Sequence, residues 1–354
     1  MEARLRGFSA PPTRLSDYNP PIAQPIFPKA LSDYLFTQSR VKLRATPSKL
    51  LQCFDRLKSN LEPTPSYQDQ IEQKHNAVRS FLENSGITAK TKLIGSHQRN
   101  TRIQPRPEDD FDIDILVELG EFTHWVQSGG VSPQDAMNRL GGALTSGDRY
   151  RAMNPQKDQP TVVFEHANGI IIELVPAYLD MAGHSGNGTL HFPTGRAYWI
   201  PIRDVWQLAD YDFDADFVTK RNEVGDRWVI PTIKMLKAVK RTFFPGMTSY
   251  HLEILAAGLL PMLIARRRQQ SQPMSYPALI TDFLAEAEPL ITVGHKPQGS
   301  LSPFVQLEGV SITQTFTGFQ AVRKYCQSIA TISNENSKIK LWRELFGDPF
   351  TISD

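Results

Sequence analysis

Apolar residues recur at helical spacing over much of the chain. They do so in residues 47–60 and again in residues 66–84, where the pattern stops near Asn84 and Gly86. Beyond about residue 190 the pattern predicts mainly helices, at residues 228–241, 249–268, 277–286, 314–332 and 337–346. In the first of these, apolar residues form one stripe and basic residues lie roughly opposite, which predicts a helix with a dry side and a basic side.

A period of two residues predicts strands. Residues 111–119 read FDIDILVEL, with an apolar side chain at every other position, which is typical of a half-buried strand. Shorter strands are predicted at residues 90–94, 161–165 and 169–175, the last of them closed by Pro176. The turn-like residues 167–169 predict that the last two form a hairpin beside the 111–119 strand. A helix is expected near residues 133–140.

Composition adds limits on size and partners. At 354 residues the chain is long enough for two lobes with a cleft between them. Its six prolines before residue 30 predict an extended arm there, because each fixes φ and removes an amide donor. The content of 40% hydrophobic and 21% charged residues argues against disorder along the whole chain. The formal charge of +2 gives little support for gripping a long nucleic acid and fits small charged substrates better.

The cysteines and the lengths of the apolar runs argue against several further classes of protein. Cys53 and Cys326 are far apart and lack Cys/His spacing, so the pattern indicates neither a disulfide framework nor a zinc site, and a reducing cytoplasm is the expected setting. No signal peptide is recognisable at the N-terminus. The longest apolar stretch, residues 252–265, is too short to span a bilayer, so we expect a buried helix and no membrane partner.

The 111–119 strand carries the first candidate chemistry. Asp112 and Asp114 project from one face, roughly 6–7 Å apart by the rise of a strand. Magnesium prefers hard oxygen ligands and completes its shell with water and phosphate, so this pair suits a triphosphate site. An acidic pair on a strand is by itself more often a solvated patch. Gly95-Ser96, upstream, would let backbone amides and a hydroxyl approach phosphate closely, although alone it reads as a plain turn.

The order of these features resembles the polymerase-beta nucleotidyltransferase superfamily. Gly95-Ser96 is followed by Asp112 and Asp114 on a strand and then by Glu173, which precedes the sequence LVPA. The most similar branch is that of the bacterial CD-NTases, second-messenger synthases related to cyclic GMP-AMP synthase and oligoadenylate synthase. The segments IKMLK at 233–237, SYHLE at 249–253 and WRELFG at 342–347 extend the resemblance over about residues 60–350.

This resemblance implies an α+β, two-lobed fold with a mixed β-sheet. Together with the proline pattern, it divides the chain into a Pro-rich arm with a first helix (1–60), a catalytic lobe (61–190) and a helical nucleotide-binding lobe (191–354), of which the arm has no counterpart in the resemblance. Asp112 and Asp114 would bind two Mg²⁺ ions, with Mn²⁺ as an alternative. Glu173 would ligate the ion at the attacking hydroxyl, although the family often has Asp there and Glu has one more methylene group. Two metals about 4 Å apart can support an in-line displacement.

The resemblance also implies the nucleotide-binding residues. Ser96, in its turn with Gly95, would touch the terminal phosphates, and Lys237 and Ser249 would hold the triphosphate from the other lobe. Tyr250 would stack on a base. From the residues alone, Lys237 could equally lie on a solvated helix face and Tyr250 in the core.

Nearby basic residues are weaker candidates. Arg99, Arg102 and Arg106 lie in the loop after the Gly-Ser turn, where they could contact phosphate, but charged loop residues mostly face water. His97 reads as a loop residue rather than a base.

Three functions remain open. The first is synthesis of a cyclic di- or oligonucleotide from ATP, GTP or other nucleoside triphosphates, in bacterial anti-phage signalling with a downstream effector that senses the product, as the resemblance implies. The second is a terminal nucleotidyltransferase acting on tRNA or another RNA, against which the near-neutral charge argues. The third is a non-catalytic nucleotide-binding or interaction module with a relic site, against which the intact acidic set argues. Base choice, linkage and ring size do not follow from the sequence.

Overall fold

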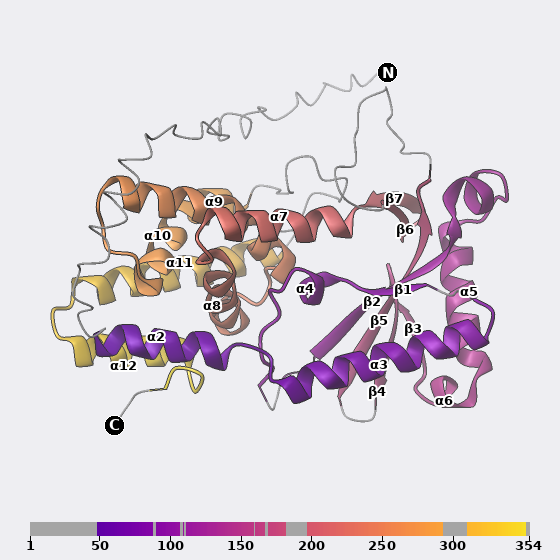
Figure 1. The fold of residues 1–354 in the computed structure, drawn as a ribbon, viewed down its shortest axis with the longest axis horizontal. Coiled ribbons are helices and arrows are strands. Elements are labelled where there is room, and N and C mark those ends of the chain that lie inside the picture. The colour runs from indigo at the N-terminus through magenta and orange to yellow at the C-terminus, as the bar shows by residue number, and fades with distance from the viewer. Residues whose placement is uncertain are drawn as a thin grey trace, which may run out of the picture. The chain divides into compact units, whose positions relative to one another are not determined.

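A computed structural model describes residues 48–87, 90–106, 109, 111–158, 160–166, 169–181, 197–292 and 310–351 (Figure 1). All of them belong to one compact unit, Ser48–Asp354. The expected Pro-rich arm falls in residues 1–47, outside the described residues, and so does the expected lobe boundary at residue 190.

The described helices include all those that the periodicity predicts. Their bounds are α2 Lys49–Asn60, α3 Pro65–Asn84, α4 Gly95–Gln98, the π-helical turn η2 Thr123–Gln127, α5 Pro133–Ser146, α6 Asp148–Arg151, α7 Tyr211–Val224, α8 Val229–Phe243, α9 Ser249–Gln269, α10 Tyr276–Ala287, the 3₁₀ turn η3 Glu288–Leu290, α11 Val310–Thr331 and α12 Glu335–Phe346.

The described strands form one mixed sheet. Their bounds are β1 Thr91–Leu93, β2 Phe111–Glu121, β3 Gln156–Asp158, β4 Thr161–His166, β5 Ile170–Leu179, β6 Tyr198–Ile202 and β7 Val205–Ala209. The order is β1-β2-β5-β4-β3, and β6 joins β5 and β7. Strands β2 and β5 are parallel and the other neighbours are antiparallel. The predicted α+β fold and the β4-β5 hairpin beside the acidic strand are confirmed.

Strand β5 does not end at Pro176 as predicted. Pairing with β4 extends only to Leu174, and pairing with β6 begins at Tyr178. At Pro176, strand β5 is therefore paired with β2 alone. Because neither β4 nor β6 pairs with β5 at this residue, the missing amide donor of Pro176 breaks no hydrogen bond to those strands.

The prediction of a half-buried β2 is wrong for most of the strand. One face packs into a core with α3 and α5, through Ile113, Ile115 and Val117. On the other face Leu116 is buried in a second cluster with β5, β6 and β7. Both faces are covered because β2 is a central strand, and only its first residues, with Asp112 and Asp114, border open space.

Strands β6 and β7 and helix α7 were not predicted. The expectation of mainly helical structure beyond about residue 190 missed the two strands, which are five residues each and include Pro201. Helix α7 has little separation of polar and apolar faces, so its sequence carries a weak periodic signal. Asp210 caps it by accepting a hydrogen bond from the Phe213 amide at 2.8 Å.

A separate core holds the helical lobe, which comprises α2 and α7–α12 (Figure 1). Phe54 of α2 packs edge-on against Trp342 of α12, with ring centroids 5.1 Å apart. Helix α8 lies inside this lobe, so Lys234 and Lys237 of its predicted basic side do not face solvent. Lys234 is 5% exposed and donates to Glu62 at 2.5 Å, and Lys237 is 7% exposed.

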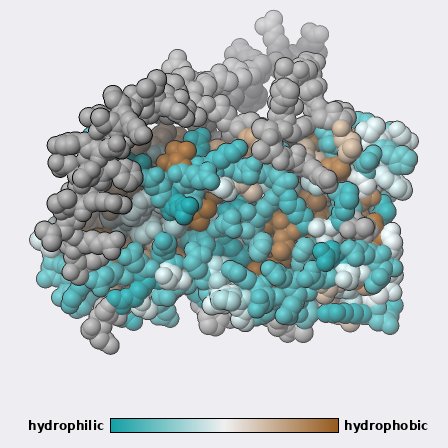
Figure 2. Space-filling model, viewed as in Figure 1, coloured by the Kyte–Doolittle hydropathy of each residue, from teal (hydrophilic) through white to brown (hydrophobic). Residues whose placement is uncertain are grey.

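The surface is mainly hydrophilic on the face drawn in Figure 2, with small separate hydrophobic areas among the described residues. Helix α9, which contains the longest apolar run, is buried over most of its length. Within the described part of the chain, no helix has the length and apolar content that crossing a membrane requires.

Candidate active site

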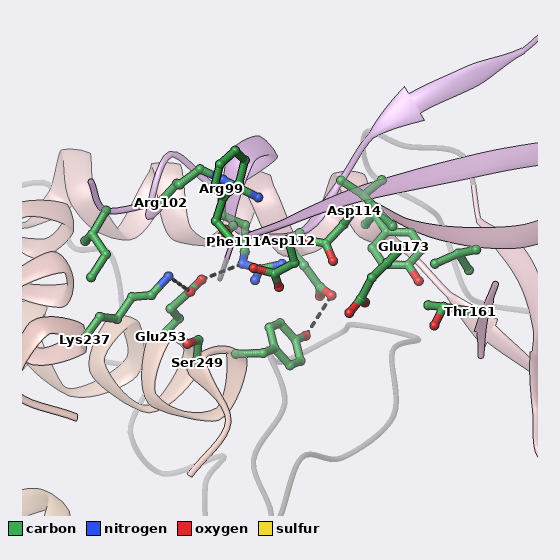
Figure 3. Close-up of a pocket in the computed structure, with 18 of the residues that line it drawn as sticks. Arg99, Arg102, Phe111, Asp112, Asp114, Thr161, Glu173, Lys237, Ser249 and Glu253 are labelled. Atoms are coloured by element: carbon green, nitrogen blue, oxygen red, sulfur yellow. Dashed lines mark hydrogen bonds and ion pairs between the residues drawn. The ribbon is translucent and has the colours of Figure 1, made fainter. Parts of the chain in front are cut away.

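Two neighbouring strands bring the three predicted acids together. In the parallel pairing of β2 with β5, Asp114 lies directly beside Glu173, and Asp112 lies two residues earlier on β2. Residues that are paired across parallel strands project from the same face of a sheet. Figure 3 shows all three carboxylates pointing into the same space.

The turn at Gly95 fits closely against this acidic strand. The Ile94 amide donates to the Asp114 carbonyl at 3.0 Å, which holds β1 and the start of α4 against β2. Gly95 has a φ of +65°, and a Cβ at this position would overlap the Asp114 carboxylate. Glycine is therefore required both for the backbone conformation and for the close approach.

Burial and mutual repulsion raise the pKa values of two of the acids. Burial, with the nearby Asp112 charge, raises the pKa of Asp114 to about 6. Burial, followed by the Asp114 and Asp112 charges, raises the pKa of Glu173 to about 7. Such a group of carboxylates carries negative charge that a bound cation would stabilise.

The carboxylates fit a divalent cation that shares its coordination with substrate. Within the described residues, no group of three or more acidic, His or Cys side chains is arranged so that it could hold a metal ion by itself. Magnesium does not need one, because it is usually held by one or two carboxylates, water and substrate phosphates. The donor set and its unbalanced charge therefore suit Mg²⁺ in the presence of a triphosphate.

All eight predicted site residues line one cavity of about 830 Å³. From the sheet come Asp112, Asp114 and Glu173, with the turn residues Gly95 and Ser96 beside them. The helical lobe contributes the remaining three, which are Lys237, Ser249 and Tyr250. The volume is in the usual range for small-molecule sites.

Lys237 is held in a buried network and is not on a solvated helix face. Its Nζ donates to Glu253 Oε1 at 2.7 Å and to the Thr101 carbonyl at 3.0 Å. Glu253 Oε2 accepts from Arg99 Nε and from Thr101 Oγ1, each at 2.7 Å. Glu253 is fully buried. Burial raises the pKa of Glu253, but Arg99 and Lys237 outweigh this effect and hold the pKa at about 2.

Tyr250 and Ser249 begin helix α9 at the edge of the cavity. The Thr248 hydroxyl caps this helix by accepting from the His251 amide at 3.1 Å. The Tyr250 hydroxyl donates to Asp214 Oδ2 at 2.7 Å, and the Arg99 guanidinium lies 4.8 Å from the ring centroid. These contacts fix the orientation of the Tyr250 ring.

Several site residues were missed or undervalued at the sequence level. Arg99 and Arg102 are each only 7% exposed and line the cavity, contrary to the expectation that such loop residues face water. Glu253 and Asp214 received no predicted role. The signal for Glu253 was an acid inside the apolar run 252–265, because a buried carboxylate in such a helix requires a cationic partner.

The site places acidic residues of neighbouring strands in a mixed sheet opposite basic residues of the helical lobe, across one cavity. This arrangement is that of a two-lobed fold of the nucleotidyltransferase class. Residues 49–195 match the family described as the Second Messenger Oligonucleotide or Dinucleotide Synthetase (SMODS) domain. This match, together with the fold shared with solved CD-NTases, confirms the resemblance to the CD-NTases.

Solved structures share the fold over most of the chain. The CD-NTase CdnG from Bradyrhizobium diazoefficiens in complex with GTP has a TM-score of 0.59 at 12% identity, covering 85% of this chain and 96% of that one. CdnC from E. coli MS115-1 with ATP has a TM-score of 0.55 at 14% identity, covering 85% and 98%. The cyclic AMP-GMP synthase DncV from Vibrio cholerae, with a linear intermediate, has a TM-score of 0.55 at 12% identity and covers 92% of each chain. No curated protein sequence matches significantly.

Proposed function

We propose that this protein synthesises a cyclic di- or oligonucleotide second messenger from nucleoside triphosphates and releases pyrophosphate. The observation that carries the proposal is the pairing of Asp114 with Glu173 on adjacent strands, opposite Lys237 and Ser249 in one cavity. A carboxylate pair facing basic side chains suits a triphosphate that is bound through metal ions at one side and through direct contacts at the other. The complexes of CdnC with ATP and of CdnG with GTP support ATP and GTP as substrates.

The chain's own residues would divide the work between the two lobes. Asp112, Asp114 and Glu173 would hold Mg²⁺, or Mn²⁺ in its place, which when bound favours deprotonation of the attacking hydroxyl and offsets the charge of the phosphates. Ser96, at the turn with Gly95, would orient the terminal phosphates.

The helical lobe would bind the remaining parts of the substrate. Lys237 and Ser249 would hold the triphosphate, and Tyr250 would stack on a base and exclude water from one of its faces. Since Lys237 already donates to Glu253 and Thr101, its position is set before the substrate arrives. Preorganised charge of this kind stabilises a transition state without reorganisation during the reaction.

The proposed setting is bacterial anti-phage signalling (CBASS) in the cytoplasm, where a downstream effector senses the product. The match of residues 49–195 to a second-messenger synthetase family supports a signalling product.

The test is incubation of the protein with labelled ATP, GTP and mixtures of nucleotides in the presence of Mg²⁺ or Mn²⁺. A product that resists phosphatase, with a mass equal to that of a cyclic nucleotide, is expected. Formation of no such product with any metal and nucleotide mixture would contradict the proposal. Transfer of label to added tRNA instead would favour the alternative terminal transferase.

Magnesium is expected to raise the melting temperature of the protein, and the increase should be larger at about pH 8 than at about pH 6. Because the pKa values of Asp114 (about 6) and Glu173 (about 7) are raised on folding, the contribution of these two acids to the stability of the metal-free fold is complete below their ordinary pKa values and is lost as pH rises through about 6 and 7. Metal binds the deprotonated acids, so its apparent affinity should increase about tenfold between about pH 6 and pH 8. Thermal melts with Mg²⁺ titrated at each pH measure this.

The control for this experiment is the double variant Asp112→Asn, Asp114→Asn, whose melting temperature should not respond to Mg²⁺. An affinity for Mg²⁺ that is equal at the two pH values would contradict the assignment of these acids as ligands.

A further inference from the structure

A carboxylate of helix α7 accepts hydrogen bonds from two neighbouring elements of the sheet lobe. Asp212, in the first turn of α7, accepts from Lys92 Nζ of β1 and, at 2.5 Å, from Gln98 Nε2 of α4. The ion pair is partly buried, with 37% of the Lys92 side chain and 26% of the Asp212 side chain exposed. None of these three residues lines the cavity. The contact instead joins two elements that do line it, α4 through Ser96 and α7 through Asp214.

Helix α4 is too short to hold its own position. It consists of the four residues Gly95–Gln98, none of which is buried. A single helical turn gains little from its own hydrogen bonds, so its position depends on contacts with its neighbours. The Ile94 amide before it is bound to β2, and the Arg99 side chain after it is bound to α9. The contact with Asp212 adds a bond to a side chain of the helix itself.

Helix α7 is the better anchored side of this contact. It has 14 residues, is capped by Asp210 at its N-terminus, and buries Val218 completely in the core of the helical lobe. The Asp214 carboxylate also accepts from the Tyr250 hydroxyl of α9 at 2.7 Å. These contacts do not involve Asp212. Loss of the Asp212 carboxylate should therefore leave α7 in place and release α4, which carries the Gly-Ser turn.

We propose that Asp212 is a positioning residue for binding of the triphosphate. Its carboxylate holds β1 and α4 against α7, and this places Ser96 beside the acidic strand, where Gly95 already lies against the Asp114 carboxylate. A substrate-binding group must be held by its surroundings to within about 0.5 Å. Because Asp212 lies outside the cavity, it acts through Ser96 rather than on the substrate. This inference deepens the proposed function and rests on it for the contact between Ser96 and the terminal phosphates.

Calorimetric titration with the α,β-methylene analogue of ATP in Mg²⁺ buffer tests this role without turnover. Asp212→Ala is expected to weaken binding of the analogue about tenfold, as the loss of one charge-assisted hydrogen bond to phosphate predicts. Asp212→Glu, which keeps the charge, should bind with intermediate affinity, and Gln98→Ala should weaken binding by less than Asp212→Ala. Binding of AMP, which lacks the terminal phosphates, should be unchanged.

Asp216→Ala is the matched control for this titration. Asp216 is the same residue type one turn further along α7, does not line the cavity, and makes no hydrogen bond or ion pair with the described residues. This variant should bind the analogue with wild-type affinity.

A double-mutant cycle with Ser96 separates positioning from a general loss of structure. If Asp212 acts through Ser96, Asp212→Ala should have little further effect once Ser96 is replaced by Ala. The double variant should then bind the analogue within about twofold of Ser96→Ala alone. Full additivity of the two losses would overturn the proposal, and so would wild-type affinity in Asp212→Ala or an equal weakening of AMP binding. If Asp212→Ala fails to fold, wild-type affinity in both Asp212→Asn and Gln98→Ala would overturn it equally.

The positioning role and the proposed function fail in different ways. If Asp212→Ala weakens binding of the analogue but the wild-type protein makes no cyclic product, Asp212 keeps its role in nucleotide binding and the proposed synthesis fails. If the wild-type protein makes the product but the KM for ATP is the same in Asp212→Ala, the positioning role fails alone.

Discussion

Replacing Asp112 and Asp114 by Asn is expected to reduce nucleotide synthesis by on the order of 10³-fold or more, without lowering the stability of the fold. Both carboxylates border the cavity at the open start of β2, and Asn keeps their size but removes the charge that binds a divalent cation. Product formation, measured with labelled triphosphates at saturating Mg²⁺, gives the loss of rate.

The same replacement should raise the melting temperature of the metal-free protein at about pH 8. Burial and the Asp112 charge raise the pKa of Asp114 to about 6, so above that pH the folded protein holds repelling carboxylates that the unfolded chain separates. Relieving this repulsion should add about 2–5 °C. An increase in stability with a loss of activity is the pattern of a functional site, since a structural residue would lose both together.

Glu121→Gln is the matched control for this experiment. Glu121 is an exposed acid at the end of the same strand and does not line the cavity. It should keep wild-type activity. Synthesis by the double Asn variant within tenfold of the wild-type rate would exclude these two acids as the metal-binding pair.

Local patterns predicted the elements that carry the site, but not how they are combined. Strict alternation located β2, and the Gly-Ser pair predicted a turn, where the structure has the start of the short helix α4. That Glu173 lies beside Asp114 depends on the parallel register of β2 and β5, which are separated in sequence by α5, α6, β3 and β4. The alternation within a strand limits which of its side chains must be buried, but it does not identify the partner strand when that strand is distant in sequence.

The helical side of the site was harder to predict for a different reason. Periodicity treats Lys237 as polar and places it toward solvent, yet the structure buries it against Glu253. Arg99 comes from the turn before β2 and meets the same carboxylate, 154 residues away in sequence. A buried ion network between distant segments cannot be inferred from charge pattern alone, because Arg99 and Lys237 look like exposed surface residues until their shared partner is known.

Replacing Glu253 by Gln is expected to destabilise the protein by about 3–5 kcal/mol at neutral pH, because two cations, Arg99 and Lys237, then remain buried without a counter-charge. A decrease in melting temperature of roughly 5–10 °C would accompany this change. Since the pKa of Glu253 is lowered to about 2 in the folded state, its contribution is complete above the ordinary carboxyl pKa and is lost as pH falls toward about 2. The stability difference between wild type and variant should therefore narrow in acid.

The matched control is Glu286→Gln, because Glu286 also pairs with an arginine, Arg266, but on the surface, where both side chains are more than 40% exposed. That change should cost less than about 1 kcal/mol, since solvent screens an exposed pair. Denaturant unfolding of both variants at neutral and acidic pH makes the comparison.

If Glu253→Gln lowered the free energy of unfolding as little as Glu286→Gln, the buried network could not be what holds Lys237 at the cavity. The preorganisation inferred for the triphosphate site would then need another origin. If the loss of stability is severe, the variant should also bind triphosphate more weakly under conditions where it is still folded, because Arg99 and Lys237 then repel each other without the carboxylate that fixes them.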